Sequence, residues 1–119
     1  MRLAYYARPI VIDGSQQELL DIETIRRIGY EPYPFEEQRE QAKQQYITEG
    51  LSIYKDYVRQ SDLLVFRAFP DGSIGAGVAQ EIAWAEEFVL PILELPRQLK
   101  RRSMSIDDTR QLLKEMGRR

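Results

Sequence analysis

Residues 61–95 read SDLLVFRAFPDGSIGAGVAQEIAWAEEFVLPILEL, and this stretch decides the fold. Leu63 to Phe69 is a continuous apolar run broken only by Arg67, as expected for a strand covered on both faces of a parallel sheet. A turn rich in proline, aspartate and glycine follows, and apolar residues then recur at helical spacing from Val78 to Val89. Ligands of open α/β sheets bind beyond the carboxyl ends of the strands, so we expect a ligand site at this turn.

The remaining sequence extends the same alternation of apolar patches and amphipathic segments. Leu3 to Ala7 is predicted to be the first strand, and Ser15 with Glu18 three residues later forms a capping-box pattern that opens the first helix. Gly29 is a natural helix stop. The buried stripe of this helix is predicted to consist of Leu19, Ile22, Ile25 and Ile28.

The middle of the chain is less regular. A short strand is expected around Tyr30 to Phe35, at a sheet edge, because prolines cannot donate ladder hydrogen bonds. Glu36 to Gln45 is polar on every side and predicts either a loop or an exposed helical lead-in. Val89 to Leu95 is predicted to be the last strand, which makes four our best strand count. One buried helix face is predicted for Ile47, Leu51, Tyr54 and Val58.

Length and composition restrict the possible functions. With 119 residues the chain is predicted to form one domain, residues 1–119. It has no stretch near the roughly 20 apolar residues of a membrane span and no signal-peptide pattern, so we expect a cytoplasmic protein without membrane partners. Cysteine and histidine are absent, so catalysis must use carboxylates, tyrosines, lysine, arginine or the backbone.

The net charge of −2 hides an uneven distribution. Residues 97–119 hold 8 Lys or Arg against 3 Asp or Glu, whereas residues 1–96 hold 9 against 16. This basic tail is predicted to contain a helix from Ser105 to Met116. The acidic body argues against broad nucleic-acid binding, and RNA binding through the tail is the least favoured hypothesis.

Three motifs together resemble one enzyme family. GVAQEIAWA at 77–85, YYARPI at 5–10 and QSDLLV at 60–65 are similar, in the same order, to motifs of the nucleoside 2-deoxyribosyltransferase family and related nucleotide N-glycoside hydrolases. The resemblance implies a small flavodoxin-like (Rossmann-like) three-layer sandwich with a four- to five-stranded parallel sheet. It also implies cleavage or exchange of the bond between a base and its sugar, without a metal or other cofactor, and a homo-oligomer whose pocket is completed by a neighbouring subunit.

The resemblance assigns roles to matching residues. It implies that Glu81 is the nucleophile that attacks the anomeric carbon of the sugar, and that Tyr5 holds this carboxylate in place. Asp71 is the nearest candidate for an acidic residue that orients the sugar or protonates the departing base. Two positions depart from the family pattern: Arg8 replaces a glycine, and Tyr54 stands where an aspartate is common.

The residue types themselves suggest how a substrate is held. Ser73, Gly75 and Gly77 could hold a phosphate through backbone N–H groups at a helix N-terminus. Arg8 could bind a 5′-phosphate or carboxylate as a bidentate partner, or it could fill the pocket.

The sequence also permits purely structural roles for the two central residues. Glu81 near a helix start is stabilised by the helix dipole whether or not it reacts, and Tyr5 on a central strand can be a core residue. The first hypothesis is therefore an enzyme acting on a nucleoside or nucleoside 5′-monophosphate. The alternative is a catalytically inactive nucleotide-binding or protein-interaction module of the same fold.

Overall fold

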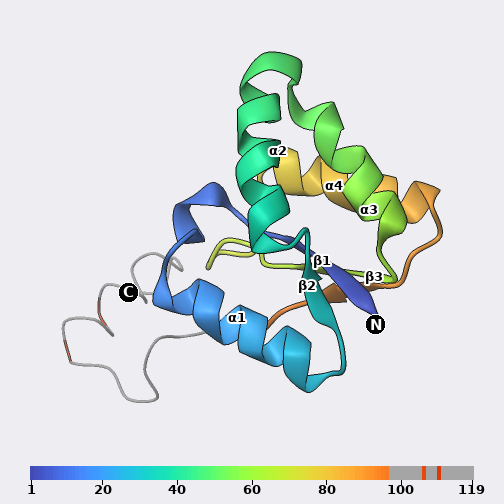
Figure 1. Ribbon diagram of the computed structural model, residues 1–119. Helices are drawn as coiled ribbons and strands as arrows, with labels where there is room; N and C mark the ends of the chain where they lie inside the picture. The colour runs from blue at the N-terminus through green and yellow to red at the C-terminus, as the bar shows by residue number, and fades with distance from the viewer. Residues whose placement is uncertain (97–105, 107–109, 111–119) are drawn as a thin grey trace.

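A computed structural model describes residues 1–96 together with Ile106 and Arg110. Its centre is a four-stranded, all-parallel sheet with the strand order β2-β1-β3-β4 (Figure 1). The fold is flavodoxin-like, as the family resemblance implies. In chain order the elements are β1 (Leu3–Ala7), η1 (Ile10–Ile12), α1 (Gln16–Arg27), β2 (Glu31–Tyr33), α2 (Glu36–Glu49), η2 (Leu51–Tyr54), α3 (Lys55–Gln60), β3 (Leu63–Phe66), α4 (Ala76–Glu87) and β4 (Ile92–Glu94).

The strand order places a topological switch point between β1 and β3. The chain leaves β1 toward β2 at one side of the sheet, and it leaves β3 toward β4 at the other side. Helix α1 covers one face of the sheet, whereas α3 and α4 cover the other, on the same side as α2 (Figure 1). The loops after β1 and β3 therefore diverge, and they leave a crevice at the carboxyl ends of these two strands.

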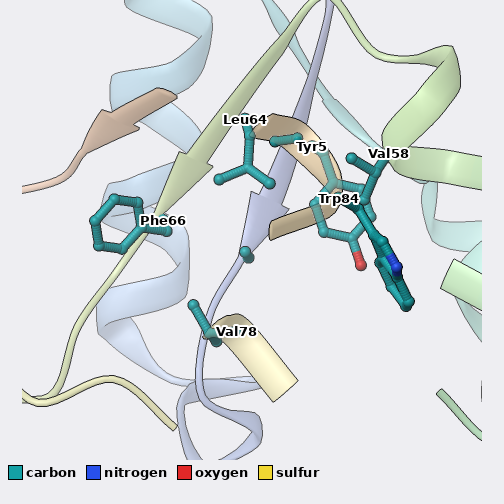
Figure 2. Packing of buried hydrophobic residues seen from close by; sticks show 8 residues of the cluster. Tyr5, Val58, Leu64, Phe66, Val78 and Trp84 are labelled. Atoms are coloured by element: carbon teal, nitrogen blue, oxygen red, sulfur yellow. The ribbon is translucent and has the colours of Figure 1, made fainter. Parts of the chain in front are cut away.

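The alternation of side chains along the strands divides the core in two. On the α3 and α4 face, the first buried cluster includes Tyr5, Val58, Leu64, Phe66 and Trp84 (Figure 2). Ala4, Tyr6, Ile25, Leu63, Val65 and Leu95 form the second cluster, on the α1 face. Since successive strand residues point to opposite faces, Tyr5 and Tyr6 enter different layers.

Several predicted elements are confirmed. The first strand has the predicted bounds, and β2 is an edge strand. Helix α1 begins after Ser15, whose hydroxyl accepts a hydrogen bond of 3.2 Å from the Glu18 N–H. Gly29, with a φ of +98°, follows the last turn of α1 as predicted. The predicted Ser105–Met116 helix lies outside the described residues, except for Ile106 and Arg110.

The predicted stripe of α1 is wrong at its two ends. Leu19 and Ile28 are 63% and 45% exposed, and the buried residues of the helix are Glu18, Asp21 and Ile25. The buried positions of α1 thus include two carboxylates where aliphatic residues were predicted. These carboxylates are paired with arginines: Arg67 faces Asp21, and Arg8 and Arg39 face Glu18. A buried carboxylate is tolerated when it is paired in this way.

The predictions for the middle of the chain are confirmed in one part and wrong in another. Residues 36–45 belong to the exposed helix α2, which is one of the two predicted alternatives, and α2 ends at Gly50 with a φ of +84°. This break separates Ile47 from Leu51 and Val58, so the predicted single helix face does not exist, and Ile47 is 77% exposed. A positive φ is favourable for glycine, which explains the position of the break.

The last strand is shorter than predicted. Strand β4 comprises Ile92–Glu94, and Val89 precedes it with a φ of +58°. The bonds of the turn match a Schellman motif: the Leu90 N–H donates to the Ala85 carbonyl at 2.8 Å, and the Val89 N–H donates to the Glu86 carbonyl at 3.1 Å. The predicted strand at 63–69 likewise ends earlier, at Phe66. Among the described residues, no helix has the length and apolar character needed to cross a membrane.

Candidate active site

A cavity of about 570 Å³ lies at the switch point of the sheet. Its floor includes Tyr5 of β1 and Glu81 of α4, and the loops after β1 and β3 contribute Arg8 and Gly75. Further lining residues come from η1, α2 and η2. The cavity therefore occupies the place where ligands of doubly wound sheets bind.

Tyr5 and Glu81 meet at the base of the cavity. Both are buried, with 3% and 8% of their surface exposed, and the Tyr5 hydroxyl donates a hydrogen bond to the Glu81 carboxylate. Glu81 comes from the second turn of α4, next to Val78 in the first core cluster. The two residues that the family resemblance pairs are thus brought into contact by the fold.

The environment of Glu81 changes its titration. Burial raises the pKa of the Glu81 carboxyl to about 7, although the hydrogen bond from Tyr5 and the positive charge of Arg8 act in the opposite direction. Burial, followed by the charge of Glu81, raises the pKa of the Tyr5 hydroxyl well above its ordinary value. Tyr5 therefore keeps its proton and acts as the donor at neutral pH, and Glu81 titrates near neutrality.

The start of α4 contributes backbone groups to the cavity. Gly75 is the N-cap of the helix and, with Gly77, lines the cavity. No side chain caps this helix end, and its first turn carries no acidic residue. A methyl group added at Gly77 would meet no atom within 4 Å, so the space there is open. This geometry resembles the anion-binding end of a helix.

Asp71 and Ser73 lie further from the cavity. Both are exposed, and the Ser73 N–H and hydroxyl donate hydrogen bonds of 2.9 and 2.6 Å to Asp71 Oδ1. Neither residue belongs to the cavity lining, which Phe69 reaches from the same loop. The substrate contacts predicted for Asp71 and Ser73 stay predictions.

Arg8 lines the cavity, but its guanidinium is held by groups of the protein. Its Nε lies 3.1 Å from Asp13 Oδ1, its Nη1 donates to the Tyr6 carbonyl at 3.0 Å, and its Nη2 lies 3.5 Å from Glu18 Oε2. The guanidinium also lies over the Tyr6 ring, 4.7 Å from the centroid. Arg8 thus joins the loop after β1 to η1 and α1.

Sequence reasoning missed the contribution of α2 and η2. Arg39, Lys43 and Tyr46 of α2, and Leu51 of η2, line the cavity, although α2 has no apolar stripe. Tyr54, predicted as part of a buried helix face and noted as a departure from the family pattern, also lines it, with its ring centroid 6.1 Å from that of Tyr46. A usable signal was present: Arg39 and Lys43 are four residues apart and so lie on one helix face.

A second set of buried polar side chains surrounds Asp21, on the α1 side of the sheet. Arg67 Nε and Nη2 donate hydrogen bonds of 2.6 and 2.7 Å to Asp21, and the Gln17 amide donates to Asp21 at 2.9 Å. Tyr6 donates a further hydrogen bond to Asp21. Arg67 Nη1 also donates to the Pro96 carbonyl at 2.9 Å, which joins the residue after β3 to the residue before the basic tail.

Within the described part of the chain, no group of three or more acidic side chains is placed to hold a metal ion. Comparisons of the chain with protein-family models, with curated proteins and with solved structures find no match.

Proposed function

We propose that this protein hydrolyses or transfers the N-glycosidic bond of a nucleoside or nucleoside 5′-monophosphate. The observation that carries the proposal is the buried Glu81 carboxylate, which accepts a hydrogen bond from Tyr5 at the base of a cavity at the switch point. A carboxylate held in this way suits attack on an anomeric carbon, whose transition state carries positive charge.

The proposed reaction has two steps. A Glu81 oxygen forms a bond to the anomeric carbon while the bond from that carbon to the base nitrogen breaks; the electron pair leaves with the base, which takes a proton from water. Water, or the nitrogen of a second base, then attacks the same carbon, and the ester bond to Glu81 breaks. The attacking group loses its proton to solvent, and the Glu81 carboxylate is restored.

Tyr5 and the start of α4 have supporting roles in this proposal. The Tyr5 hydroxyl fixes one Glu81 oxygen, which leaves the other oxygen for the substrate. In this proposal the backbone at Gly75 and Gly77, which lines the cavity, contacts sugar or phosphate oxygens.

The proposal is tested by measuring base release. Purified wild-type protein, Glu81→Gln and Glu86→Gln are incubated with ribo- and deoxyribonucleosides and their 5′-monophosphates, and free base is measured by chromatography, with and without an acceptor base. Glu86 is an exposed glutamate of the same helix and serves as the matched control. We expect release by wild type and Glu86→Gln, and a loss of roughly a thousandfold or more in Glu81→Gln.

A binding module without turnover is the second candidate. It is favoured by Arg8, whose guanidinium occupies the cavity wall where the resembling family has a glycine. Absence of base release from every substrate, together with measurable binding of a nucleotide, would support this function over the first.

The homo-oligomer expected from the family resemblance stays a proposal. Ile10, Val11 and Ile47 support it, because they line the cavity and are 75–78% exposed. Exposed apolar side chains that gather around a cavity are typical of an interaction site. Light scattering after size-exclusion chromatography, with Ile47→Lys as the variant, measures the oligomeric state; we expect an oligomer that this change dissociates.

A further inference from the structure

Three cationic side chains gather at the side of the cavity formed by α2. Arg39 and Lys43 lie one turn apart on α2, and Arg8 lies opposite them after β1. Two carboxylates, Asp13 and Glu18, lie among them, so this cation cluster of five side chains has one positive charge in excess. An excess charge beside an open cavity attracts an anion.

The distances locate the excess charge at Lys43. Arg8 lies 2.9 Å from Asp13 Oδ1, and Arg39 lies 3.2 Å from Glu18 Oε2, so each carboxylate has an arginine partner. Lys43 Nζ is 3.9 Å from Asp13 Oδ2, beyond hydrogen-bond distance, and its side chain is 48% exposed. Arg39 is likewise 3.7 Å from Asp13. Lys43 therefore has N–H groups to offer to a ligand, and Arg39 lies beside it.

The other groups that line the cavity differ in chemistry from this cation cluster. Tyr46 and Tyr54 present aromatic rings, which suit contact with a planar base. Glu81 with Tyr5 is the place proposed for the sugar. A carboxylate, a pair of aromatic rings and an excess cation thus line one cavity of about 570 Å³.

We propose that Lys43, with Arg39, forms an anion subsite that binds the phosphate of a nucleoside 5′-monophosphate. The inference rests on the proposed function for the identity of the base and sugar, whereas the cation cluster supplies the preference for a phosphorylated ligand. A phosphate monoester carries close to two negative charges at neutral pH, so it gains more from Lys43 and Arg39 than a neutral hydroxyl does.

The test compares the affinities of matched ligands. Binding of the 5′-monophosphates of the common bases, and of the corresponding nucleosides, is measured by calorimetry in a Glu81→Gln background, which prevents turnover. The variants are Lys43→Ala and Lys43→Glu. Lys55→Ala is the control, because it removes the same charge from a partly buried position outside the cavity lining, where the Lys55 side chain is 39% exposed and pairs with Glu87 at 3.7 Å. Circular dichroism checks that each variant is folded.

We expect the protein to bind at least one 5′-monophosphate roughly tenfold or more tightly than its nucleoside. Lys43→Ala should remove most of this preference, Lys43→Glu should reverse it, and Lys55→Ala should leave it intact. Nucleoside affinity should be the same in all the lysine variants. Raising the salt concentration should weaken binding of the monophosphate only.

Three results would contradict the proposed phosphate subsite. The protein could bind phosphorylated and unphosphorylated ligands with equal affinity, or it could bind no monophosphate. The third result is a phosphate preference that both Lys43 variants retain. These failures differ from failure of the proposed function. If the wild type releases base but shows no preference for phosphorylated ligands, the proposed reaction is supported and the phosphate subsite is wrong. If phosphorylated ligands bind more tightly in a way that depends on Lys43, but the protein with intact Glu81 releases no base, the phosphate subsite is supported and the proposed reaction is wrong.

Discussion

The hydroxyl of Tyr5 donates a hydrogen bond to the carboxylate of Glu81, although the two residues are 76 positions apart in the sequence. Tyr5 lies on β1 and Glu81 lies on α4, so this bond joins the central strand to the helix that follows the neighbouring strand. The fold thus places a titratable carboxylate at the base of a cavity and supplies it with a proton donor.

Replacing Tyr5 with phenylalanine should move the pH dependence of base release upward. The hydrogen bond from Tyr5 lowers the pKa of Glu81, so its loss raises that pKa above about 7. The reaction needs ionised Glu81, and we therefore expect release at pH 7 to fall roughly fivefold and to recover at higher pH. Tyr30→Phe, outside the cavity lining, is the control. If the pH profile of Tyr5→Phe is the same as that of the wild type, Tyr5 does not lower the pKa of Glu81 as proposed.

Glu81→Gln should stabilise the protein at alkaline pH. The pKa of Glu81 is about 7 in the folded protein against an ordinary 4.5, so the folded state holds a proton that the unfolded state releases between these values. Stability contributed by this group is complete below pH 4.5 and is lost as the pH rises to 7. Urea unfolding should show Glu81→Gln more stable than wild type by about 1–3 kcal/mol at pH 8, and similar at pH 4. Glu86→Gln, at an exposed position, should change little at either pH.

Asp21→Asn should destabilise the fold strongly. The change removes the charge that faces Arg67, whose side chain is only 7% exposed, and leaves a buried guanidinium without its carboxylate partner. Breaking a buried ion pair costs about 3–5 kcal/mol. Urea unfolding should give a loss of this size, whereas Glu23→Gln, which breaks the exposed Glu23–Arg27 pair on the same helix, should cost less than about 0.5 kcal/mol. Equal losses for the two variants would show that the Arg67 pair is not the cause.

Val89→Gly should stabilise the protein. Helices α1 and α4 end in the same hydrogen-bonded motif, with Gly29 at a φ of +98° in one and Val89 at a φ of +58° in the other. A β-branched residue is strained in this left-handed region, and Val89 is 87% exposed, so its side chain offers little packing in return. Thermal unfolding should show a gain of about 1 kcal/mol, after allowance for the greater freedom of glycine in the unfolded chain.

Gly29→Val is the reciprocal experiment. A Cβ atom added at Gly29 would meet no atom within 4 Å, so the cost of Gly29→Val reports mainly the backbone conformation. We expect a loss of about 1–2 kcal/mol in thermal unfolding. Stabilisation by Gly29→Val, or destabilisation by Val89→Gly, would refute the role of backbone strain at these two positions.

Local signals in the sequence predicted much of the fold correctly. The apolar run at 63–69 indicated a strand, although β3 ends at Phe66. This run, the Ser15 cap and Gly29 each act within a few residues, so they can be recognised without the tertiary structure. The prolines near 32–34 likewise predicted an edge strand. These features depend on backbone hydrogen bonding and conformation, which the residue type itself limits.

Long-range partners account for the places where the sequence-based predictions were wrong or incomplete. Asp21 is buried because Arg67, 46 positions away in the sequence, pairs with it. The spacing of aliphatic residues, from which the buried face of α1 was predicted, carries no information about this pair. In the sequence, Arg39 and Lys43 are typical of the solvent-exposed face of a polar helix. The tertiary structure shows that they line the cavity.

The sequence by itself therefore determined the order of strands and helices and, through the family resemblance, named Tyr5 and Glu81 as partners. Only the tertiary structure decided that these two side chains meet in a buried place, and that α2 brings cations and aromatic rings to the same cavity. The physical reason is that secondary structure follows from nearby residues, whereas burial, pairing and pKa depend on groups that the folded chain brings together from distant positions.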